Sequence, residues 1–99
     1  MRVISQALRD SARGQNCTLR LNGCLYDPET VVLAHLPCGQ KGVGMKSPDV
    51  LAIFCCAACH NFLDGANRWD IHARDYLRAL AETQMVWIEK GLLTVKGMK

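Results

Sequence analysis

The stretch VLAIFCCAACH, residues 50–60, joins a short apolar run to a pair of cysteines that are separated by two residues. The first half, Val50 to Phe54, predicts an apolar β-strand. The second half predicts a helical turn that begins at the cysteine pair and stops before Gly65. A Cys-x-x-Cys pair at the start of a helix, here Cys56 and Cys59, can supply two ligands to one metal ion.

An earlier run, Thr30 to Leu36, is rich in β-branched residues and predicts a first strand that ends near His35. The segment between the two strands, Cys38 to Asp49, carries three glycines, two lysines and Pro48, so we expect a loop there. The two strands would pair as a hairpin with a long connection. Hairpin and helical turn together predict a ββα unit inside a small α+β fold.

Two more helices are expected outside this unit. Ile4 to Ala12 predicts a short helix with Ser5 as its N-cap and with Ile4 and Leu8 facing inward. Asp70 to Lys90 predicts one long amphipathic helix packed behind the ββα unit. Its apolar positions recur at helical spacing: Leu77, Leu80, Ala81, Trp87 and Ile88.

Composition limits the class of protein. The chain has 99 residues, 49% of them hydrophobic, which predicts a single globular domain over residues 1–99. No apolar run approaches the roughly 18 residues needed to span a bilayer, and the first residues lack the apolar stretch of a secretory signal. We therefore expect a cytoplasmic protein without a membrane partner. The net charge of +3 is compatible with a nucleic-acid partner but does not by itself indicate one.

Six cysteines in a reducing compartment are more often metal ligands than disulfides. Cys17 and Cys24 flank a predicted strand and an Asn-Gly turn, so this N-terminal knuckle could bring a second thiol pair to Cys56 and Cys59. The sequence thus predicts a structural Zn²⁺ site with four cysteine ligands. The gap between Cys17 and Cys24 is longer than the usual spacing of about two to four residues.

The remaining cysteines leave alternatives open. Cys55 could replace Cys56 as a ligand, but its spacing to Cys59 is less typical, and the strand pattern points its side chain toward the core. Cys38 has no predicted role. The competing interpretation of Cys17, Cys24, Cys56 and Cys59 is a set of unpaired thiols in the core.

Taken in order, a His at a strand end, a Gly-rich loop, a second apolar strand and Cys-x-x-Cys-His resemble the HNH, or ββα-metal, nucleases over roughly residues 17–64. The resemblance implies that His35 is the general base of phosphodiester hydrolysis. It also implies that His60, on the helix, holds a catalytic divalent cation, Mg²⁺ or Mn²⁺. Over nearly the whole chain the layout is similar to the small prophage-encoded endodeoxyribonucleases of the YbcO type, which implies DNA as the substrate.

The sequence departs from the HNH pattern at two positions. Ala34 stands where many relatives have an acidic or histidine metal ligand, and Leu51 stands where the middle Asn is usual. Asp64, four residues after His60 on the same helical face, could supply a carboxylate to the metal. Asp49 is a second choice for that role.

These departures favour a rival of another class, a catalytically inactive zinc-stabilised module that binds nucleic acid or protein. A thiol redox protein is disfavoured because the thioredoxin-like context is absent. The loop Gly39 to Lys46 could approach a phosphate but lacks the P-loop spacing, so no nucleotide cofactor is expected. No heptad repeat predicts an oligomeric state.

Overall fold

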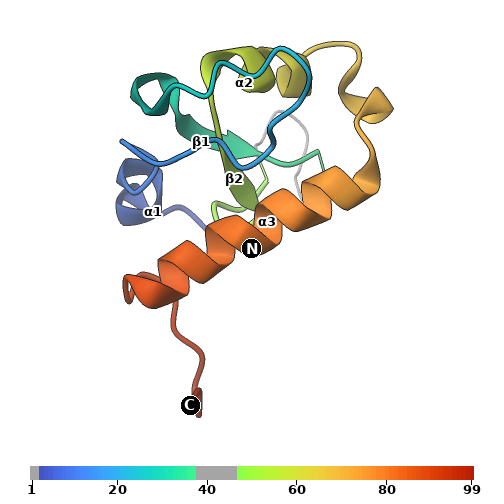
Figure 1. Ribbon diagram of the computed structural model, residues 1–99. Helices are drawn as coiled ribbons and strands as arrows, with labels where there is room; N and C mark the ends of the chain where they lie inside the picture. Colours follow the sequence, from blue (N-terminus) through green and yellow to red (C-terminus); the bar gives the residue numbers. More distant parts are fainter. Residues whose placement is uncertain (1–2, 38–46) are drawn as a thin grey trace.

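A two-stranded antiparallel sheet lies between helices in the computed structural model, which describes residues 3–37 and 47–99 (Figure 1). Helix α2 lies above the hairpin in this view and α3 crosses below it. The predicted α+β class is confirmed. The elements in chain order are α1 (Gln6–Asp10), a 3-10 turn (Pro28–Thr30), β1 (Val32–His35), β2 (Ala52–Cys55), α2 (Ala57–Asp64), a second 3-10 turn (Arg68–Asp70) and α3 (Ala73–Glu89).

The predicted hairpin is present. Val32 pairs with Cys55 at one end of the sheet and His35 pairs with Ala52 at the other. All four residues of β2 are buried, because α2 and α3 both pack against this strand. A strand covered on both faces is apolar throughout rather than alternating, which explains the unbroken run that marks it in the sequence.

The outer edge of β2 is closed by two threonine side chains. The carbonyl oxygen of Phe54 accepts from the backbone N–H of Thr18 at 2.8 Å and from its hydroxyl at 2.9 Å. The Phe54 N–H donates to the hydroxyl of Thr83 at 3.3 Å. Both threonines are buried, so these bonds satisfy backbone groups that water does not reach.

Helix α1 begins where the sequence predicted, because the hydroxyl of Ser5 accepts from the N–H of Leu8 at 3.2 Å as an N-cap. Leu8 is buried, as expected. The inward orientation predicted for Ile4 is wrong, since its side chain is 58% exposed. Ile4 precedes the cap, and helical spacing does not govern a residue outside the helix.

The long C-terminal helix is confirmed, and Trp87 is buried as expected, but the predicted face is wrong at Leu77 and Ala81. Leu77 is 67% exposed, and Ala81 is exposed as well. The buried residues of α3 are Ala79, Thr83 and Trp87. Ala79 and Thr83 have small side chains, which let α3 pack closely against β2. The helix therefore turns these residues toward the sheet, although Leu77 has the larger apolar area to bury.

The strand predicted between Cys17 and Cys24 is absent. Arg20 has φ of 50°, in the left-handed region, which interrupts an extended backbone. The Asn-Gly turn does form, with the Cys24 N–H donating to the Leu21 carbonyl at 2.9 Å and Gly23 at φ of 87°. The knuckle is therefore a series of turns that bends the chain back toward α2.

The largest fully buried side chains of the described residues include Trp87, Phe54, Leu19, Ile53 and Leu63. Trp87 and Phe54 form an edge-to-face pair with ring centroids 6.1 Å apart. The Trp87 indole N–H donates to the Ser11 hydroxyl at 2.8 Å, which joins α3 to the end of α1. No helix in the described ranges has both the length and the apolarity to cross a bilayer.

Candidate functional site

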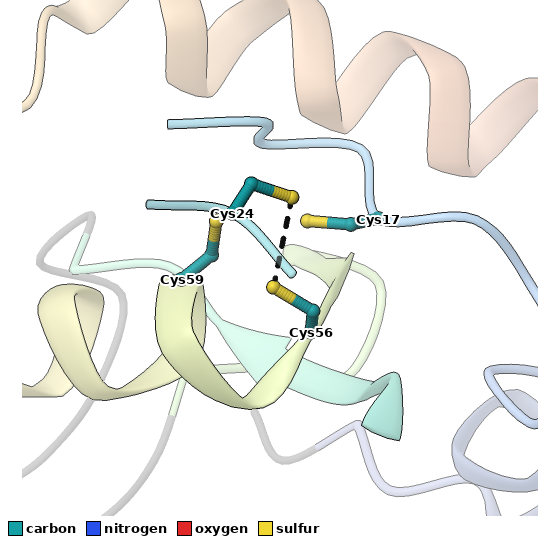
Figure 2. A group of neighbouring side chains, drawn as sticks. All are labelled: Cys17, Cys24, Cys56 and Cys59. Carbon is teal, nitrogen blue, oxygen red and sulfur yellow. Dashed lines mark hydrogen bonds between the residues drawn. The ribbon is translucent and has the colours of Figure 1, made fainter. Parts of the chain in front are cut away.

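Four thiols from distant parts of the chain meet beside the start of α2. The Sγ atoms of Cys17, Cys24, Cys56 and Cys59, which form the cysteine cluster, all lie within 4.8 Å of one another. Figure 2 shows the two knuckle cysteines approaching the pair on α2, with Cys24 Sγ and Cys56 Sγ 3.7 Å apart. The sequence therefore identified a set of residues that the fold brings together.

The cysteine cluster fits a tetrahedral metal ion. A Zn–S bond of about 2.3 Å gives a sulfur-to-sulfur spacing of about 3.8 Å, close to the 3.7 Å between Cys24 and Cys56. Two backbone amides already donate to the sulfurs: Leu25 N–H to Cys56 and Tyr26 N–H to Cys24, both at 3.4 Å. Such bonds stabilise thiolates. All cysteines in the described residues are free, so no disulfide competes for these thiols.

Without a cation the cluster does not favour four thiolates. A hydrogen bond from Cys55 lowers the pKa of Cys17 well below its usual value, whereas burial raises the pKa of Cys59 far above it. A divalent cation supplies the positive charge that lets neighbouring thiols lose their protons. Cys55 is itself fully buried beneath the cluster, in the core position that its place on the strand predicted.

A second group of polar residues surrounds the end of β1. His35 Nε2 lies 2.7 Å from Asp49 Oδ1, and the Asp49 side chain is 1% exposed. The other carboxylate oxygen accepts from the Ser5 N–H at 2.7 Å and from Arg9 Nε at 3.0 Å. Arg9 Nη2 also donates to Oδ1, at 3.3 Å. Asp49 thus joins the strand-end histidine to helix α1.

Asp49 is a carboxylate throughout the physiological range. Burial alone would raise its pKa, but hydrogen bonds from Arg9, His35 and Ser5 outweigh this effect and lower the pKa to about 2. An ionised carboxylate can only accept, so His35 Nε2 carries the proton of this bond. In the neutral form of the ring, Nδ1 is then the acceptor nitrogen. Within residues 3–37 and 47–99 no group is hydrogen-bonded to that atom.

The sequence did not reveal this arrangement in full. The sequence indicates Asp49 only as a second-choice metal ligand, whereas in the structure both its oxygens are bonded to protein groups. Arg9 and Ser5 were missed as partners of Asp49, and neither is marked by local spacing. The one available signal was that Asp49 stands directly before the second strand of a hairpin whose first strand ends at His35.

Leu36, the residue directly after His35, is also held in place. The Ser47 hydroxyl donates to the Leu36 carbonyl at 2.7 Å, and the Leu36 N–H donates to the Leu51 carbonyl at 3.0 Å. Leu51 therefore holds the residue after His35 through its backbone carbonyl. Ala34 is fully buried, so its side chain faces the core rather than the surface that His35 reaches.

On α2, His60 and Asp64 are brought together as their spacing predicted. His60 Nε2 lies 3.0 Å from Asp64 Oδ2, and the two side chains are 32% and 65% exposed. In the described residues no third His, Cys, Asp or Glu joins them in a metal-binding group. The pair thus offers one nitrogen and one carboxylate to a ligand from solvent.

A cleft of about 320 Å³ opens between α1 and β1. His35 lies on its β1 wall, and Arg9 and Arg13 lie on the other side. The glycine-rich loop that was expected to approach a phosphate, and Cys38 with it, fall outside the described residues.

Comparison with known proteins places the chain in a family. A family described as "Putative nuclease YbcO" matches residues 6–92. The "Putative nuclease YbcO" of Escherichia coli strain K12 is 40% identical over 91 residues, which cover 87% of this chain and 95% of the relative. The "Putative nuclease ybcO" of Enterobacteria phage 82 matches with the same identity and coverage.

A solved structure agrees with the sequence relatives. It is described as "Structure of a putative bacteriophage protein from Escherichia coli str. K-12 substr. MG1655", and it superposes with a TM-score of 0.64 at 33% identity. The match covers 86% of this chain and all of the solved one. Because the family match and the 40% identical relatives both span most of its length, the chain belongs to the YbcO family.

Proposed function

We propose that this chain is a metal-dependent endonuclease that hydrolyses DNA phosphodiester bonds through an HNH-like site. The observation that carries the proposal is the His35–Asp49 pair, in which a buried, ionised carboxylate holds the imidazole through Nε2, while no described residue is hydrogen-bonded to Nδ1. The names of the relatives, which describe nucleases, support the same class of reaction.

His35 acts as the general base in this proposal. A neutral imidazole has an unperturbed pKa near 6.5, so it can take a proton from water at physiological pH. Asp49 sets the tautomer, because its bond to Nε2 leaves the lone pair on Nδ1. The carboxylate also stabilises the imidazolium that forms when Nδ1 accepts the proton. Deprotonated water would then attack the scissile phosphorus.

The cysteine cluster would hold a structural zinc ion. Cys56 is the N-cap of α2 and Cys59 lies in its first turn, so a bound ion fixes the start of this helix against the knuckle. His60 follows Cys59 directly and is thereby positioned with it. His60 and Asp64 are the residues that would hold Mg²⁺ or Mn²⁺, with water and substrate oxygens as the other ligands. Such a cation neutralises charge on the scissile phosphate and on the leaving oxygen.

The order of elements supports the HNH-like interpretation. An antiparallel hairpin, β1 and β2, is followed directly by α2, which packs back against both strands. His35 stands at the end of the first strand and His60 stands on the helix. This order of the two histidines agrees with the one that the resemblance to HNH nucleases implies for the base and the metal-binding residue.

Plasmid nicking tests the proposal. Purified zinc-loaded protein is incubated with supercoiled plasmid and Mg²⁺ or Mn²⁺, beside the variants His35→Ala and His60→Ala. The third histidine of the chain, His72, provides a matched control, because it is exposed and caps α3 by accepting from the Arg74 N–H at 3.0 Å. Zinc content and circular dichroism are measured for each variant.

We expect nicking by the parent and by His72→Ala, and loss of nicking of about 100-fold or more in His35→Ala, the range of a lost general base. Cutting that survives both His35→Ala and His60→Ala would contradict the proposed mechanism. If the parent cuts no form of DNA with any divalent ion yet retards it in a gel, the chain is instead a zinc-stabilised binding module.

A further inference from the structure

We propose that the cleft between α1 and β1 binds the phosphodiester backbone of DNA, with Arg13 as a phosphate-binding residue. The inference rests on the proposed function for the identity of the ligand. It goes further in naming the surface along which the DNA backbone runs past His35, and in naming a contact outside the proposed catalytic groups.

The chemistry of the cleft walls suits an anion. His35 lies on one wall, and the α1 side presents two arginines, Arg9 and Arg13, against one carboxylate, Asp10. Gln6 and several apolar side chains that include Leu33 complete the lining, and the apolar ones can contact sugar faces. Arginine is the side chain best suited to phosphate, because its planar fork of N–H donors matches two phosphate oxygens at once.

Arg13 is free to bind such an oxygen. Its side chain is 86% exposed, and its nearest acidic partner, Asp10, lies 3.8 Å away and is 53% exposed. An ion pair at this distance and exposure contributes little to stability, so a phosphate can replace Asp10 as the partner of Arg13. Asp10 itself opposes the approach of a phosphate, and its removal should therefore favour binding.

Arg9 is unsuited to the same test. Two of its nitrogens hold Asp49, at 3.0 and 3.3 Å, so replacing Arg9 would also disturb His35. Its side chain remains 41% exposed on the cleft wall. Arg13 has no such link to Asp49, which makes it the residue whose removal reports on binding alone.

The test is fluorescence anisotropy with a labelled 20-base-pair DNA duplex, in the presence of zinc-loaded protein and without added Mg²⁺ or Mn²⁺. Three variants are compared with the parent: Arg13→Gln, Asp10→Asn and Arg74→Gln. Arg74 is the matched control, since it is an exposed arginine on α3 that does not line the cleft. The dissociation constant is measured over a series of salt concentrations.

We expect Arg13→Gln to weaken binding about 8-fold at 0.1 M salt and to reduce the slope of log K against log salt by about 0.9, the effect of one lost phosphate contact. Asp10→Asn should tighten binding, and Arg74→Gln should leave both the affinity and the slope unchanged. If Arg13→Gln and Arg74→Gln have the same small effect, or if the parent does not bind the duplex, the inference is wrong.

The binding assay separates this inference from the proposed function. Arg13-dependent binding without any plasmid nicking would leave the cleft assignment standing and remove the catalytic role. Nicking by the parent together with unchanged binding by Arg13→Gln would leave the catalytic role standing and remove the cleft assignment.

Discussion

Replacing Asp49 with Asn tests how the strand-end histidine is held. The substitution keeps the shape of the side chain but converts one oxygen into an NH₂ group. Oδ2 accepts from two donors, the Ser5 N–H and Arg9 Nε, so the amide oxygen must occupy that position. The new NH₂ group then faces His35 Nε2, which must become an acceptor.

The cost in stability follows from the pKa of Asp49. The folded state lowers it from 3.8 to about 2, and each pKa unit corresponds to about 1.4 kcal/mol of preference for the ionised form. A neutral amide cannot provide that preference, so we expect the free energy of unfolding at pH 7 to fall by about 2 kcal/mol. Urea unfolding can be followed by the fluorescence of Trp87, which is fully buried.

The cost in activity should be larger. A neutral imidazole that accepts a hydrogen bond at Nε2 carries its proton on Nδ1. Nδ1 of His35 then has no lone pair with which to deprotonate water, the step that the proposal requires. We expect plasmid nicking to slow by about 100- to 10,000-fold, the full contribution of a general base. Nitrogen-15 NMR of the histidine rings reports the tautomer directly.

Asp70→Asn is the matched control, because Asp70 is exposed and lies in the turn before α3. It should change neither stability nor nicking. The reasoning is refuted if Asp49→Asn moves the ring proton to Nδ1 while nicking stays within about threefold of the parent. It is refuted equally if the ring proton of His35 stays on Nε2 in the variant.

Three further predictions concern stability. Cys59→Ser should abolish binding of one zinc equivalent and unfold most of the chain by circular dichroism, because structural zinc provides roughly 10 kcal/mol or more; retention of stoichiometric zinc would contradict this. The stability difference between the parent and Asp49→Asn should be fully present at pH 7. It should disappear as the pH falls from 3.8 toward 2, since a lowered carboxylate pKa stabilises the fold only above that range. Trp87→Phe should lower the free energy of unfolding by about 2 kcal/mol, through a cavity and the lost bond to Ser11, and an unchanged urea midpoint would contradict it.

The hairpin and α2 could be predicted from the sequence because each depends on local signals. An apolar run bounded by glycine and proline predicts a strand, and Cys-x-x-Cys before a helical pattern predicts both the helix start and two ligands. The other two cysteines were identified as partners by their type, although the strand predicted between them is replaced by turns around Arg20.

Other features depend on contacts that no local pattern encodes. Asp49 contacts Ser5 and Arg9, which are 44 and 40 residues away in the chain. The orientation of α3 was misjudged because hydrophobic periodicity weighs large side chains such as Leu77, whereas close packing on β2 selected the small residues Ala79 and Thr83. Which face of a helix is buried thus depends on how the helix packs in the tertiary structure, and not on its own sequence pattern alone.

The two threonines that bond to Phe54 have a consequence for association between chains. A two-stranded sheet normally leaves unpaired N–H and C=O groups along its edges, and these can recruit strands from other molecules. Here Thr18 and Thr83 occupy both backbone groups of Phe54 at the middle of the outer edge of β2. This side of the sheet is therefore closed to strand addition, and neither amyloid-like pairing nor capture of an extended peptide can begin there while α3 stays in place.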